Sequence, residues 1–97
     1  MNTTLSAGCP TVVTISPSAA ILEQGDVLTC SADGYTPTYM WTGTAGVNGA
    51  TISGTEATYE PPEGPFILAC TATVGELGCS DLEFLVGTVY SKYWQES

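Results

Sequence analysis

The sequence contains no histidine and almost no positive charge. Lys92 is the one basic residue against ten acidic ones, which gives a net charge of −9. A serine or threonine nucleophile therefore lacks its usual base, and a zinc site lacks both histidine and any C-x-x-C pair. A phosphate backbone or an anionic membrane would require lysine and arginine. We therefore expect no enzyme activity, no metal or other cofactor, and neither nucleic acid nor membrane as a partner.

Long apolar runs are also missing. No stretch approaches the roughly 18 apolar residues of a membrane span, and the first residues, MNTTLSAGCPTVV, have no basic region followed by an apolar core. The 97 residues suffice for one domain. We expect a complete natural chain that carries no secretory signal, rather than a domain excised from a longer protein.

Charged residues make up 11% of the chain, against roughly 25% in ordinary globular domains. Threonine, serine and glycine take their place, as is common on extracellular and virion proteins. We expect the acidic residues to be solvated surface groups rather than calcium ligands, because no D-x-D spacing occurs. The surface of the folded domain should offer few large apolar residues and make a poor interface.

Four cysteines allow three disulfide pairings. Two of them, with a tryptophan between, lie in the segments LTCSA, TYMWTG and ILACTATV, which alternate apolar and polar residues as half-buried strands do. The cysteines are Cys30 and Cys70, and the tryptophan is Trp41. This order and spacing resembles the core signature of immunoglobulin-type (Ig-type) β-sandwiches.

The resemblance implies an all-β, Ig-like β-sandwich of about seven antiparallel strands in two sheets. It implies a Cys30–Cys70 disulfide between the sheets, with Trp41 packed against it. Cys9 and Cys79 then remain as a second pair. The first and last strands of such folds often run parallel, which would bring the starts of these two strands to the same end of the sandwich.

Strands are predicted over residues 11–16, 27–32, 36–43, 56–60, 66–74 and 82–90, with a short segment at 19–23 that could change sheets. Residues 45–54 should form short edge strands and turns. Residues 61–65 should form a stiff proline loop, because proline is excluded from central strands. The core then spans about residues 11–89, between a flexible N-terminal arm (1–8) and a C-terminal tail (91–97).

One position departs from antibody-type domains, which place a tyrosine two residues before the second cysteine. This chain has Leu68 there, which we expect in the core. Other pieces, among them Tyr39-Met40-Trp41-Thr42-Gly43 and Gly78-Cys79-Ser80, are similar to Ig-like and PKD-like modules of bacterial surface proteins and phage virions. The resemblance covers about residues 11–89.

It implies a non-enzymatic binding or structural protein at a virion surface or outside the cell. The first hypothesis is a decoration or cement protein of a tailed-phage capsid, whose partner would be the major capsid protein. The alternative is an adhesion module of a bacterial surface protein.

The C-terminal tail concentrates aromatic side chains near the single base. Tyr90, Lys92, Tyr93 and Trp94 form the predicted partner-binding group, because aromatic residues are favoured anchors at interfaces. The alternative is that these side chains fold back over the edge of the sandwich.

Overall fold

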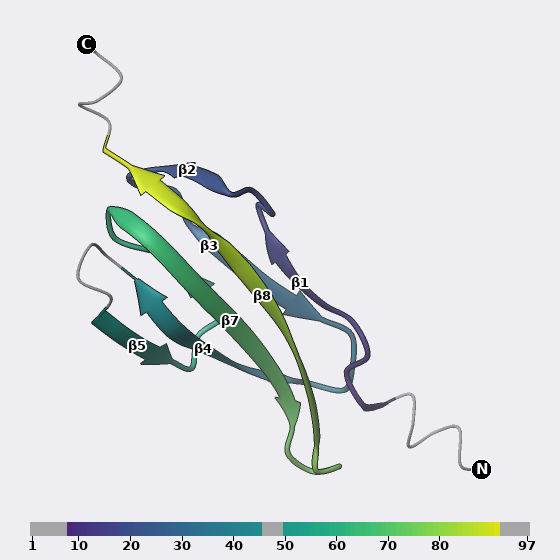
Figure 1. The fold of residues 1–97 in the computed structure, drawn as a ribbon. Coiled ribbons are helices and arrows are strands. Elements are labelled where there is room, and N and C mark those ends of the chain that lie inside the picture. Colours follow the sequence, from purple (N-terminus) through teal and green to yellow (C-terminus); the bar gives the residue numbers. More distant parts are fainter. Residues whose placement is uncertain (1–7, 46–49, 92–97) are drawn as a thin grey trace.

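The chain folds into two β-sheets that face each other across one core (Figure 1). The computed structural model describes residues 8–45 and 50–91 of the 97. The strands are β1 (Val13–Ser16), β2 (Ile21–Glu23), β3 (Leu28–Ala32), β4 (Thr38–Ala45), β5 (Ala50–Gly54), β6 (Thr58–Tyr59), β7 (Gly64–Val74) and β8 (Cys79–Tyr90). This all-β arrangement is compatible with the predicted sandwich.

A three-stranded sheet has the order β1-β3-β6, and a five-stranded sheet has the order β2-β8-β7-β4-β5. β2 and β5 form opposite edges of the larger sheet (Figure 1). All described pairs are antiparallel except β2 with β8, which is parallel. β1 and β2 follow each other along the chain but belong to different sheets, as expected for a first strand that changes sheets at residues 19–23.

The core lies between the sheets and follows the predicted alternation. The inward side chains of β7 are Phe66, Leu68, Cys70 and Ala72, all of them buried. Trp41 on β4 lies opposite Cys70 in the register and is also buried. The Cys30–Cys70 disulfide joins β3 to β7 and so links the two sheets. The Cys9–Cys79 disulfide is present as well.

β7 begins earlier than the proline rule predicts. It starts at Gly64 and includes Pro65, which we placed in a loop. Pro65 pairs with Thr88 of β8. It is the second residue of β7, and proline is tolerated near the start of a strand.

β8 also begins earlier, at Cys79 rather than at residue 82. Val74 pairs with Cys79, so only residues 75–78 connect the two strands. Gly78 has a φ of 68°, in the left-handed region that glycine adopts without steric cost. The tight turn continues the β7–β8 ladder to its end, and this is why Cys79 is the first residue of the strand.

Candidate functional site

The outer surface of the five-stranded sheet carries the largest group of exposed apolar side chains. Six large hydrophobic residues lie on it, each between 43% and 66% exposed. We call this group the outer face: Ile21, Met40, Ile67, Leu82, Phe84 and Val86. Three further exposed hydrophobic residues, Val12, Val27 and Tyr35, lie elsewhere in the described chain.

Strand register brings the outer face together from four strands. Ile67 of β7 pairs with Val86 of β8, and Ala69 pairs with Phe84. Thr71 lies between Leu82 on one side and Met40 of β4 on the other. The described residues in these rows are apolar side chains, threonines and one serine, Ser53 of β5, and none of them is charged. A contiguous apolar area of this kind is a candidate interaction site.

This finding corrects the expectation that the folded domain offers few large apolar residues. The sequence does contain the signal. Apolar residues recur every second position at Leu82, Phe84 and Val86, while Leu85 and Val89 occupy the opposite side of the same strand. An apolar pattern on both sides of a strand indicates that both faces of the sheet make contacts, and the sequence-based prediction considered only the inward face.

Acidic residues lie around the outer face rather than within it. Glu63 precedes β7 and Glu23 ends β2 at one end of the sheet, and Glu76 lies in the turn at the other end. Asp81 and Glu83 alternate with the outer-face residues of β8 and line a groove against β1. An uncharged centre with an acidic margin complements a partner whose apolar surface is bordered by lysine and arginine.

The groove between β8 and β1 has a volume of about 410 Å³ and contains Asp81 and Glu83 as its charged residues. Across residues 8–45 and 50–91, no group of three or more histidine, cysteine or acidic side chains is placed to hold a metal ion. This groove is an acidic depression between β1 and β8.

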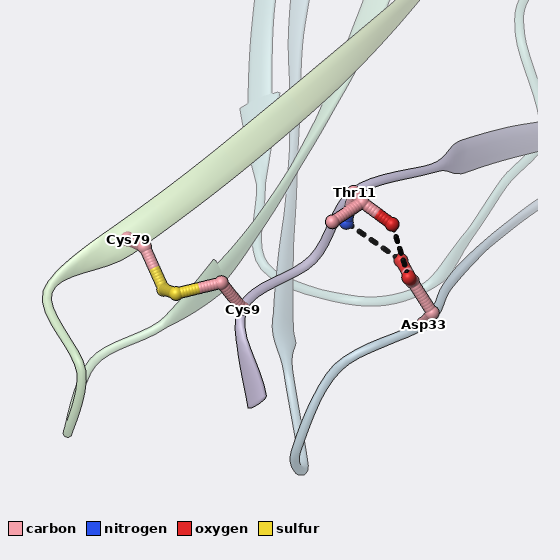
Figure 2. Close-up of a disulfide and its surroundings, with 4 residues drawn as sticks. All are labelled: Cys9, Thr11, Asp33 and Cys79. Carbon is pink, nitrogen blue, oxygen red and sulfur yellow. Dashed lines mark hydrogen bonds between the residues drawn. A yellow bond between two sulfur atoms is a disulfide. The ribbon is translucent and has the colours of Figure 1, made fainter. Parts of the chain in front are cut away.

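The N-terminal segment is held by a disulfide and by hydrogen bonds to Asp33 (Figure 2), and the Gly8 carbonyl accepts a hydrogen bond from the Tyr35 N–H at 2.9 Å. Cys9 is bonded to Cys79 at the start of β8. Asp33 accepts hydrogen bonds from the Thr11 hydroxyl and from the backbone N–H groups of Thr11 and Val12. These bonds favour the carboxylate and lower the pKa of Asp33 to about 2, with the Thr11 hydroxyl contributing most.

A second groove, of about 360 Å³, opens at the other edge, where β5 and β6 leave the space between the sheets uncovered. Its lining residues are Trp41, Ser53, Gly54, Thr55, Glu56, Thr58 and Tyr59. The Trp41 and Tyr59 ring centroids are 6.1 Å apart. The Trp41 Nε1–H is buried and has no hydrogen-bond partner in the described structure. Burial raises the pKa of the Tyr59 phenol, so it stays uncharged near neutral pH.

The predicted tail site is described only at its first residue. Tyr90 ends β8, pairs with Glu23 and accepts a hydrogen bond from the Gln24 N–H at 2.8 Å. Lys92, Tyr93 and Trp94 lie outside the described residues, as does the arm over residues 1–7. Ser91, which we placed in the tail, is buried.

Comparison of the chain with protein-family models, with curated proteins and with solved structures finds no match. None of the described residues forms a helix of the length and hydrophobicity needed to cross a membrane.

Proposed function

We propose that this chain is a non-enzymatic, Ig-like binding protein that docks the outer face of its five-stranded sheet onto a protein partner. The observation that carries the proposal is the six-residue apolar outer face without a charge in its described rows. The buried Trp41 and the disulfide between the sheets support the Ig-like assignment. Two disulfides favour an oxidising location such as a virion surface or the extracellular space.

The partner is a protein whose apolar surface is bordered by basic residues. A second copy of this chain is disfavoured, because it would bring another net charge of −9 to the interface. Of the partners considered from the sequence, we propose the capsid of a tailed phage, on which the protein acts as a decoration or cement subunit. A subunit that coats a larger assembly would turn its apolar outer face toward the assembly and its acidic remaining surface toward solvent.

The direct test is co-sedimentation of the purified, oxidised chain with capsids of the phage that encodes it. Ile67→Thr combined with Phe84→Thr should reduce occupancy at least about tenfold, because two apolar anchors leave the interface. Val12→Thr combined with Val27→Thr is the matched control, since these exposed valines lie off the outer face. Unchanged occupancy of the folded Ile67/Phe84 variant would overturn the docking surface.

A chain truncated after Ser91 distinguishes binding through the outer face from binding through the predicted tail site. Truncation at this point keeps the buried Ser91 and removes residues 92–97. If the truncated chain binds fully, the tail hypothesis is wrong and the outer face suffices. If the full chain does not bind capsids at all, the virion function is wrong, and the adhesion-module alternative should be tested next on isolated bacterial surface proteins.

A further inference from the structure

The edge formed by β5 is open to an additional strand. β5 pairs with β4, and the described sheet order ends there. Proteins use charged residues and proline to block pairing at exposed edges. The sequence of β5, ATISG, has neither. An edge of this kind can accept an extended segment through backbone hydrogen bonds.

The groove beside this edge offers a place for a side chain of such a segment. β6 contributes two residues, so the smaller sheet ends short and leaves Tyr59 and Trp41 at the groove. Glu56 is the charged residue of the lining, and the other polar residues are Ser53, Thr55, Thr58 and Tyr59. A carboxylate beside aromatic rings, with no cation in the lining, suits an ammonium or guanidinium group.

Gly54 keeps the groove open. It lies opposite Trp41 in the β4–β5 register, and a Cβ built on it meets nothing within 4 Å. Gly54 is also absent from the glycines with positive φ, so neither the backbone nor the packing requires a glycine. The absence of a side chain at this position leaves open space at the groove.

We propose that an extended segment of a partner protein adds to β5 and places a lysine or arginine side chain in the groove beside Trp41, Tyr59 and Glu56. The net charge of −9 favours such a basic segment at longer range. This site lies at the edge of the sheet and is separate from the outer face, so the two proposals can fail independently.

The test is a titration of the full-length, oxidised, ¹⁵N-labelled chain with the blocked peptide Thr-Val-Lys-Val-Thr, followed by heteronuclear NMR. We expect shifts in the β5 amides and in the Trp41 indole N–H. The same peptide with norleucine in place of lysine should bind about three- to tenfold more weakly, because it lacks the charge. Equal affinity of the two peptides would overturn the role of the groove.

Two variants locate the site. Gly54→Leu should fill the groove and abolish the difference between the lysine and norleucine peptides. Gly75→Leu is its control, because a Cβ at Gly75 also meets nothing within 4 Å but lies in the β7–β8 turn.

Glu56→Gln keeps the size of the side chain and should lower the affinity for the lysine peptide to that for the norleucine peptide. It also keeps the proposal testable if Gly54→Leu does not fold. Shifts confined to the outer face, or no shifts at all, would show that this inference is wrong. Shifts on the outer face would leave the proposed function standing.

Discussion

The two faces of the five-stranded sheet are built from the same strands and are both apolar, yet only one of them is covered. Leu68 and Ile67 are neighbours on β7. Leu68 is 0% exposed between the sheets, whereas Ile67 is 53% exposed on the outer face. Exposed apolar area does not stabilise the isolated chain. Folding of the isolated chain therefore does not account for this apolar face, and this is the basis on which we propose a partner for it.

The largest expected effect comes from the disulfide inside the covered face. Cys30→Ala with Cys70→Ala removes a cross-link over 40 residues, worth about 4 kcal/mol in the loop-entropy model. It also removes sulfur atoms from two fully buried positions, which adds a packing loss. We expect a chain that is largely unfolded at 37 °C, as measured by near-UV circular dichroism.

Cys9→Ala with Cys79→Ala is the matched comparison. It opens a longer loop of 70 residues, and the lost cross-link should lower stability by about 4 kcal/mol through chain entropy. Both cysteines are only partly buried, so we expect no added loss of packing. The hydrogen bonds from Thr11 and Val12 to Asp33 remain. This variant should be the more stable of the two in urea, and the reverse order would contradict the packing argument.

Alanine substitutions at Leu68 and Ile67, adjacent on β7, should lower the free energy of unfolding by different amounts. Leu68→Ala should lower the free energy of unfolding by about 2–5 kcal/mol, because it leaves a cavity in the core. Ile67→Ala should cost less than about 1 kcal/mol, because half of that side chain is already in water. Urea denaturation of both oxidised variants measures the difference, and equal losses would show that the outer face is covered in the free chain.

The inward face could be predicted because its signals are local. The cysteine–tryptophan–cysteine spacing and the alternation in β7 identify Trp41, Leu68 and Cys70 as core residues, and all three are buried. The outer face required knowledge of which strands are neighbours, because Met40 and Leu82 are brought together by long-range pairing through Thr71. Pro65 misled the prediction because proline is tolerated near the start of a strand, and the sequence alone did not show that β7 begins at Gly64.

The outer face should cause self-association when the net charge of the protein is reduced. As the pH falls toward about 4, carboxyl groups protonate and the net charge of −9 no longer keeps the molecules apart. We expect light scattering to rise for the native chain and much less for Phe84→Thr with Val86→Thr. The Val12→Thr, Val27→Thr control should scatter like the native chain. If it scatters as little as the outer-face variant, the outer face is not the cause.

The smallest effect concerns the hydrogen bonds from Thr11 and Val12 to Asp33, which hold the N-terminal segment. The pKa of Asp33 is lowered from 3.8 to about 2 in the folded chain by the bonds from Thr11 and Val12. A lowered folded-state pKa contributes stability above the unfolded value of 3.8, and this contribution is lost as the pH falls through about 2. Asp33→Asn should therefore flatten the dependence of unfolding free energy on pH between these two values, while leaving the slope above pH 5 unchanged.

Thr11→Val removes the largest contributor to the shift and should bring the Asp33 pKa back toward 3.8, as measured by carboxyl-carbon NMR. An unshifted Asp33 in the native chain would mean that these hydrogen bonds do not persist in solution, and that the segment is held by the Cys9–Cys79 disulfide and the Tyr35–Gly8 backbone hydrogen bond.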